Sequence, residues 1–106
     1  MKNIYTVVFV TASSRGEARK IARSLLEKRL AACVNILGGI ESLFWWKGKI
    51  DRGKELLLVI KSRTSKLPGI IKAVKSAHSY DVPEIIALPV EGGYKPYLDW
   101  IDGSLN

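Results

Sequence analysis

The densest polar chemistry of this 106-residue sequence lies in one seven-residue stretch, residues 78–84. It holds the only histidine, a tyrosine and two carboxylates: His78, Tyr80, Asp81 and Glu84. An imidazole nitrogen can bind a borderline divalent ion such as copper or zinc, and carboxylate oxygens can add further ligands. Because a tight site usually needs three or four convergent ligands, we predict only weak metal binding at His78. The alternative is a structural histidine at a helix end, bonded to a free carbonyl or a carboxylate.

A second candidate site combines Glu55 and Lys61, which bracket the most apolar strand, with Tyr80 and Glu84. Residues six apart on a strand share a face. These four side chains could therefore form a polar pocket where subunits meet, and Trp46 could stack on a ligand there. Equally, the same charges could form ion pairs that fix the register between subunits. The sequence leaves both interpretations open.

No constellation for catalysis is visible. Cys33 lies in an apolar stretch, where a free cysteine usually packs in the core, and nothing in the spacing brings it to His78. The sequence also lacks a phosphate-binding loop and a metal-ligand motif. We therefore expect a protein that is not an enzyme. A single cysteine cannot form an internal disulfide, which favours a reducing compartment.

The charge balance, 17 Lys and Arg against 10 Asp and Glu, gives a net charge of +7 and makes anionic partners worth considering. Arg15, Arg19 and Arg23 form a stripe at helical spacing, which is typical of a solvated helix face. RNA-recognition sheets carry stacking aromatics on the third strand, and residues 56–60 have none. We expect no specific nucleic-acid binding, only weak association that is lost as salt rises.

Length and composition predict one domain over residues 1–106, with 47% apolar and 25% charged residues. No apolar run is long enough to cross a bilayer, so no membrane partner is expected. The first residues, Met1 to Tyr5, pass into a strand pattern without a basic leader and an apolar signal core. The cytoplasm is the expected location.

The first half of the chain reads as strand, helix and long hairpin. Residues 4–11 form an unbroken apolar run, which predicts a central strand buried on both faces. Ser14 begins a helix with Glu17 in a capping box. Residues 31–61 then form a hairpin that should overhang the domain, because its arms exceed the usual strand length. We expect a bulge at 38–39, a turn near 47–48 and a break at 52–53.

The second half adds a helix, a strand and a short terminal helix at 94–105. Ser65 is the expected cap of the second helix, which ends near His78. The strand at 83–90 has a proline near each end and should lie at an edge, because proline cannot donate to a ladder. The buried side of the helix is predicted to comprise Leu67, Ile70, Ile71, Val74 and Ala77.

This order, β-α-β-β-α-β with an added helix, predicts a ferredoxin-like α+β fold. In that topology both main helices cover one face of a four-stranded antiparallel sheet. The other face stays bare. Because residues 56–60 place apolar side chains on both faces, we expect the molecule to self-associate.

Several residue blocks, taken in order, resemble the CutA1 family of small divalent-cation-tolerance proteins. The blocks are 27–35 (EKRLAACVN), 45–50 (WWKGKI), 82–86 (VPEII) and 97–101 (YLDWI), together with Glu55, Lys61, His78 and Tyr80. The resemblance implies a ferredoxin-like subunit in a tight homotrimer, similar in build to the PII signalling proteins. It also implies divalent cation binding, chiefly copper, and no established catalytic reaction. The alternative function is that of a PII-like regulatory trimer that binds a small ligand between subunits.

The sequence departs from the family pattern at three points. Lys47 stands where an acidic residue is common, and Ser79 replaces the proline usual after the histidine. Val10 and Ala77 occupy places where some bacterial members carry a cysteine and a second histidine proposed as metal ligands. Most of that copper site is therefore missing from this sequence.

Overall fold

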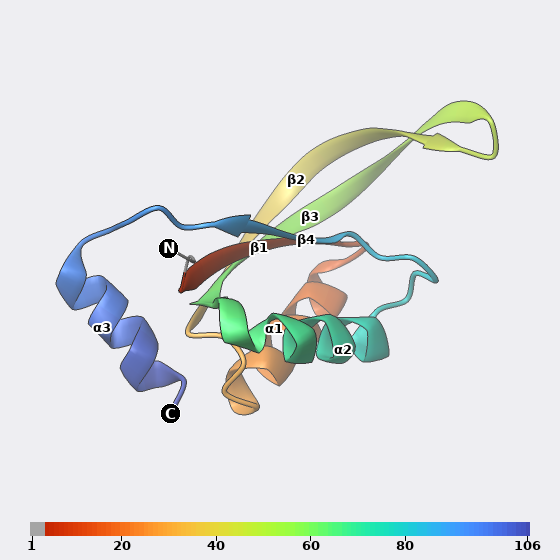
Figure 1. The fold of residues 1–106 in the computed structure, drawn as a ribbon. Helices are drawn as coiled ribbons and strands as arrows, with labels where there is room; N and C mark the ends of the chain where they lie inside the picture. The colour runs from red at the N-terminus through yellow and green to blue at the C-terminus, as the bar shows by residue number, and fades with distance from the viewer. Residues whose placement is uncertain (1–3) are drawn as a thin grey trace.

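A four-stranded antiparallel sheet carries two helices on one face, and a third helix lies at one end of the sheet (Figure 1). The computed structural model describes residues 4–106; residues 1–3, part of the stretch expected to lack a leader, lie outside it. The strand order is β2-β3-β1-β4. This confirms the predicted ferredoxin-like fold with its extra terminal helix. The elements are β1 (Tyr5–Ala12), α1 (Arg15–Glu27), β2 (Cys33–Trp46), β3 (Lys49–Arg63), η1 (Thr64–Lys66), α2 (Leu67–Ala77), β4 (Ile85–Pro89) and α3 (Lys95–Ser104).

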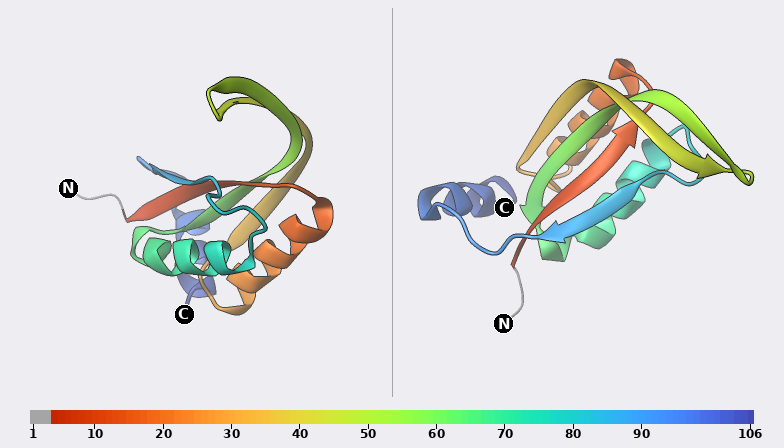
Figure 2. Two further views of the ribbon diagram at one scale, coloured as in Figure 1. Left: turned by 90° about the vertical axis from the view of Figure 1, so that its right-hand side faces the viewer. Right: turned by 90° about the horizontal axis from the view of Figure 1, so that it is seen from above.

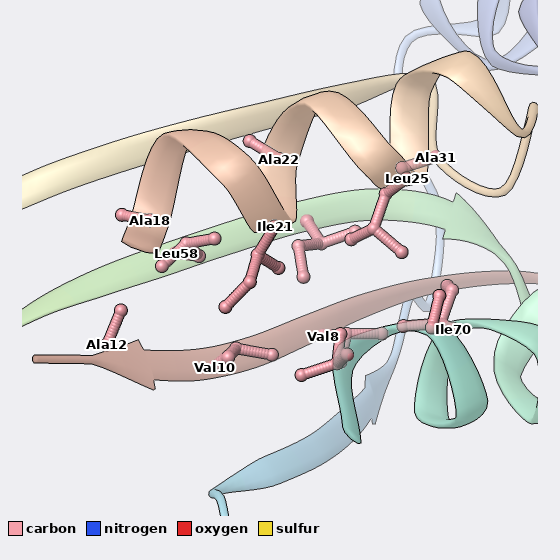
Figure 3. Packing of buried hydrophobic residues seen from close by; sticks show 13 residues of the cluster. Val8, Val10, Ala12, Ala18, Ile21, Ala22, Leu25, Ala31, Leu58 and Ile70 are labelled. Atoms are coloured by element: carbon pink, nitrogen blue, oxygen red, sulfur yellow. The ribbon is translucent and has the colours of Figure 1, made fainter. Parts of the chain in front are cut away.

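The core fills the space between the sheet and the layer formed by α1 and α2 (Figure 3). Alternate residues of the two central strands, Val8 with Val10 and Leu58 with Ile60, are fully buried there. Helical spacing places Ile21 and Leu25 of α1, and Ile70 and Val74 of α2, against them. On the opposite face of β1, Tyr5, Val7 and Phe9 are only half buried. The prediction that this strand is central is therefore confirmed, but within one chain it is not buried on both faces.

The starts of the two main helices differ. Ser14 Oγ accepts a hydrogen bond from the Glu17 N–H at 3.1 Å, which confirms the predicted cap of α1. Ser65 does not cap α2, because a 3-10 turn, η1, carries the chain into that helix and Lys66 occupies the cap position. Ile71 is 44% exposed rather than buried, since it lies on the flank of α2. The helix ends at His78, as predicted.

The hairpin of β2 and β3 projects beyond the body and curves back over it (Figures 1 and 2). Its register shifts between Leu37 and Ile40, where Gly39 has φ +73°, so the predicted bulge is present. The turn at Lys47 and Gly48 has positive φ at both residues, as a two-residue type I′ hairpin turn requires. The predicted break at residues 52–53 is wrong, because both residues stay paired with β2.

The terminal helix α3 is fastened to the sheet by one carboxylate. Asp102 accepts a hydrogen bond from the Tyr5 hydroxyl at 2.7 Å and forms an ion pair with Arg63. These two partners lower the pKa of Asp102, the tyrosine contributing most. Ile101 and Leu105 pack beside Ala32 below them. The helix therefore covers only the end of the sheet nearest Tyr5.

Most of the sheet face opposite α1 and α2 has no cover in the chain. Strand alternation places these apolar side chains on it: Val7, Phe9, Leu37, Leu57, Val59, Ile86 and Leu88. The exposed fraction of Ile86 is 55% and that of Leu37 is 46%. We call this surface the open face. β4 lies at one edge of the sheet, as predicted, and β2 at the other. None of the helices between residues 4 and 106 has both the length and the apolar composition of a membrane span.

Candidate functional site

His78 sits at the carboxyl end of α2, where the chain turns toward β4. Its side chain is fully buried, and Nε2 lies 2.7 Å from the carbonyl oxygen of Thr11. Nδ1 accepts a hydrogen bond from the Tyr80 N–H at 3.1 Å. A carbonyl only accepts and a backbone N–H only donates, so the ring is the neutral tautomer with its proton on Nε2. Both nitrogens are thus occupied. This geometry favours the structural alternative over a metal ligand.

Glu17, on α1, bonds to the loop that follows His78. The sequence predicted Glu17 only as a member of a capping box. Its carboxylate accepts hydrogen bonds from the N–H and hydroxyl of Ser13, and from the N–H of Ser79 at 2.8 Å. Burial alone would raise the pKa of Glu17, but these donors outweigh it and lower the pKa to about 2. The carboxylate therefore ties the loop after α2 to the turn before α1.

Tyr80 and Glu55 form the part of the predicted pocket that one chain does assemble. The Tyr80 hydroxyl donates to Glu55 Oε2 at 2.9 Å, and the Tyr80 ring lies tilted against His78 at a centroid distance of 4.6 Å. Burial and the Glu55 carboxylate raise the pKa of Tyr80 to about 12. Burial, and then the Glu55 charge, also raise the pKa of Glu84. Glu55, Tyr80 and Glu84 therefore share one acidic environment at the start of β4.

Lys61 and Trp46 do not reach this cluster within one chain. Lys61 lies on the same face of β3 as Glu55, but six residues of extended strand separate them by about 20 Å. Its ammonium group bonds to Asn35 and lies 3.9 Å from Cys33 Sγ. Trp46 lies at the hairpin tip, 56% exposed, with the Lys47 ammonium 5.8 Å from its ring centroid. A pocket with all five predicted members would need more than one copy of the chain.

The residues of one chain do not fit a dedicated copper site. No group of three or more His, Cys, Asp or Glu side chains in residues 4–106 is placed to hold a metal ion. Val10, at a position proposed as a ligand in some bacterial relatives, is fully buried in the apolar core. Cys33 is half buried beside Lys61 rather than enclosed in the core, and it lies at the start of β2, whereas His78 follows the end of α2. Any cation bound by a single chain would therefore rely on too few ligands for tight affinity.

The fold is that of a small ferredoxin-like α+β protein. The polar groups around His78 bond to one another rather than forming an open metal site. Comparison with known proteins gives the family. The sequence profile described as CutA1 divalent ion tolerance protein matches residues 6–104. The chain belongs to the CutA1 family.

Individual CutA proteins are similar to this chain in both sequence and structure. The divalent-cation tolerance protein CutA of Archaeoglobus fulgidus is 48% identical over 103 residues, which cover 97% of this chain and all of that protein. The chloroplastic protein CutA 1 of rice is 48% identical over 98 residues, 92% of this chain. The solved structure of the periplasmic divalent cation tolerance protein CutA from Archaeoglobus fulgidus superposes with a TM-score of 0.94 at 46% identity, covering 97% of this chain and 100% of that chain.

The plant relatives are longer than this sequence. The matched region spans 55% of the rice protein and 54% of the chloroplastic protein CutA of Arabidopsis thaliana. The domain described here thus corresponds to about half the length of those two proteins. It matches the archaeal relative from end to end.

Proposed function

We propose that this protein acts as a homotrimer in the response to divalent metal ions and binds copper or a similar cation weakly. Family membership supports the role in cation tolerance. The open face is the single observation that carries the assembly. It exposes apolar residues from all four strands of the sheet, more than a soluble monomer normally leaves to water.

The long hairpin supports a closed ring of subunits. β2 is an edge strand, and its far half carries exposed Leu43, Phe44, Trp45 and Trp46. Neither tryptophan is buried within the chain. An exposed apolar edge promotes association, and a rotationally symmetric ring satisfies each such edge with a neighbour. In the proposed trimer the hairpin wraps a neighbour and its edge pairs with a strand of another subunit.

Light scattering coupled to size exclusion tests the trimer. We expect a mass three times the 11.8 kDa of one chain. Leu57→Glu places a charge on the open face, and Ser76→Glu places one on an exposed position of α2 as a matched control. Only the first variant should dissociate the trimer. A monomeric mass for the unmodified protein at micromolar concentration would contradict the proposal.

Weak cation binding is assigned to carboxylates rather than to His78. Glu55 and Glu84 act electrostatically on one another at the start of β4, and a divalent cation would relieve that repulsion. Two carboxylates are too few for a tight site. We propose no catalytic reaction. We propose a cytoplasmic setting, since the half-buried lone thiol of Cys33 suits a reducing compartment.

A second candidate function is that of a PII-like regulator that binds a small ligand between subunits. The cluster of Glu55, Tyr80 and Glu84 favours it, because it places a hydroxyl and two carboxylates at one edge of the open face. Such a ligand would bring cationic or hydrogen-bond-donating groups. Binding of a cationic metabolite that is unaffected by Glu55→Gln would count against this alternative.

A further inference from the structure

The net charge of the protein lies entirely in one layer. Residues 15–29 and 64–77, which contain α1, η1 and α2, carry nine basic and two acidic residues, a net charge of +7. The rest of the chain carries eight of each sign and is neutral. We call these two segments the helix layer. It lies on the side of the sheet opposite the open face (Figures 1 and 2).

The cations of the helix layer are mostly unpaired. Within residues 4–106, eight of the nine have no acidic partner within ion-pair distance, and only Arg23 pairs with a carboxylate, that of Glu27. Two of the eight, Arg29 and Lys75, instead donate to the backbone carbonyls of Ser104 and Asp81. The other acid of the layer, Glu17, is occupied by Ser13 and Ser79. The six unpaired cations are Arg15, Arg19, Lys20, Lys28, Lys66 and Lys72.

Pairing is more common elsewhere in the molecule. Arg52 lies near Glu41, Arg63 pairs with Asp102, and Lys95 pairs with Asp99. The positive potential of the molecule is therefore concentrated over α1 and α2, where two carboxylates, those of Glu17 and Glu27, face nine cations.

The shape and composition of this layer select one kind of anion. Arg15, Arg19 and Arg23 are exposed and follow one another along α1 every four residues, about 6 Å apart along the helix axis. The layer contains no aromatic residue on which single-stranded bases could stack. Its apolar faces are packed on the sheet, and only Leu26 and Ile71 are exposed large aliphatic side chains, so it lacks the broad apolar surface of a membrane-adsorbing helix.

We propose that the helix layer is a docking surface for the phosphate backbone of double-stranded nucleic acid, bound without sequence preference. A duplex presents one negative charge per about 1.7 Å of axis and releases counterions when Lys and Arg neutralise it. The unpaired cations supply that neutralisation. This surface is separate from the open face and from the Glu55–Tyr80–Glu84 cluster.

Fluorescence anisotropy with a labelled DNA duplex, measured between about 50 and 200 mM salt, tests the proposal. The triple variant Arg19→Gln, Lys20→Gln, Lys72→Gln alters three exposed and unpaired side chains, so the fold should persist. We expect affinity at low salt to fall about tenfold or more, and the salt slope of binding to decrease by about 2.7, since each phosphate contact contributes about 0.9.

The matched control removes the same charge from the hairpin. Lys47→Asn, Lys49→Gln, Lys54→Gln also changes three cations without acidic partners, and we expect its duplex affinity to stay within about twofold. An equal loss in both variants would show that net charge alone governs binding and would overturn the proposal. So would the absence of duplex binding, a preference for one of two unrelated duplex sequences, or tighter binding to single-stranded DNA or phosphatidylserine vesicles. Circular dichroism and light scattering verify that both variants keep the fold and mass of the unmodified protein.

Discussion

His78 joins the end of α2 to Thr11 at the end of β1, with 2.7 Å between its Nε2 and the Thr11 carbonyl oxygen. The two residues are 67 positions apart in sequence. The ring also holds the loop that follows it, through the Tyr80 N–H. The only imidazole of the protein therefore works as a brace between the helix layer and the sheet.

The first prediction separates this brace from a metal ligand. His78→Ala should leave copper affinity unchanged in titration calorimetry, because both ring nitrogens are already bonded within the protein. The same variant should lose about 2 kcal/mol or more of unfolding free energy, since a buried carbonyl and a backbone N–H lose their partner. A loss of copper binding with little change in stability would instead make His78 a ligand.

The second prediction concerns acid stability and Glu17. Its folded pKa of about 2 lies below the ordinary glutamate value of 4.5, so the stabilisation is complete above about pH 5 and is lost as pH falls toward 2. A fall in pKa from 4.5 to about 2 corresponds to roughly 3 kcal/mol. Glu17→Gln should therefore be less stable at pH 7 and lose less stability on acidification. Urea unfolding at fixed protein concentration from pH 7 to 3 measures both; parallel curves would contradict the prediction. Glu27→Gln is the exposed control on the same helix.

The third prediction uses the opposite shift at Glu84. Burial and the Glu55 charge raise its pKa, so ionised Glu84 destabilises the folded state at pH 7, and this cost disappears as pH falls below the unfolded pKa. Glu84→Gln should raise the thermal midpoint at pH 7 and have little effect near pH 3. If Glu84→Gln instead lowers the thermal midpoint at pH 7, a cation from another subunit must pair with Glu84. That result would favour the intersubunit ion pair, one of the two interpretations that the sequence left open.

The fourth prediction compares two glycines. Gly48 has φ +76° in the hairpin turn, so Gly48→Ala should cost about 1 kcal/mol. Gly103 lies near the end of α3, and an added Cβ there meets nothing within 4 Å. Gly103→Ala should therefore stabilise by about 0.5 kcal/mol. Chemical unfolding of both variants measures the difference; equal signs would show that the turn is not as described.

Local patterns predicted the fold well because each element carries its own signal. The cap at Ser14, the bulge at Gly39 and the edge position of β4 all follow from local chemistry. One such pattern failed, and the reason was also local. Ser65 lost its role as a cap because the chain enters α2 through a 3-10 turn.

The candidate site was only partly predictable, because its contacts join residues that are far apart in sequence. Glu55 and Tyr80 meet across 25 positions, and their residue types marked them as polar partners in advance. The contact between His78 and Thr11 could not be predicted from residue type, because the backbone carbonyl of Thr11 rather than its side chain accepts the hydrogen bond. The part of Glu17 in holding Ser79, 62 positions away, was equally invisible to spacing.

The bulge at Gly38 and Gly39 also determines which side of the hairpin each later side chain of β2 points to. Side chains alternate along a strand, so an odd number of inserted or deleted residues at that point exchanges the two sides of the distal hairpin, including Trp45 and Trp46. Inserting or deleting one residue at these glycines would move the side chains of Trp45 and Trp46 to the opposite faces of the hairpin.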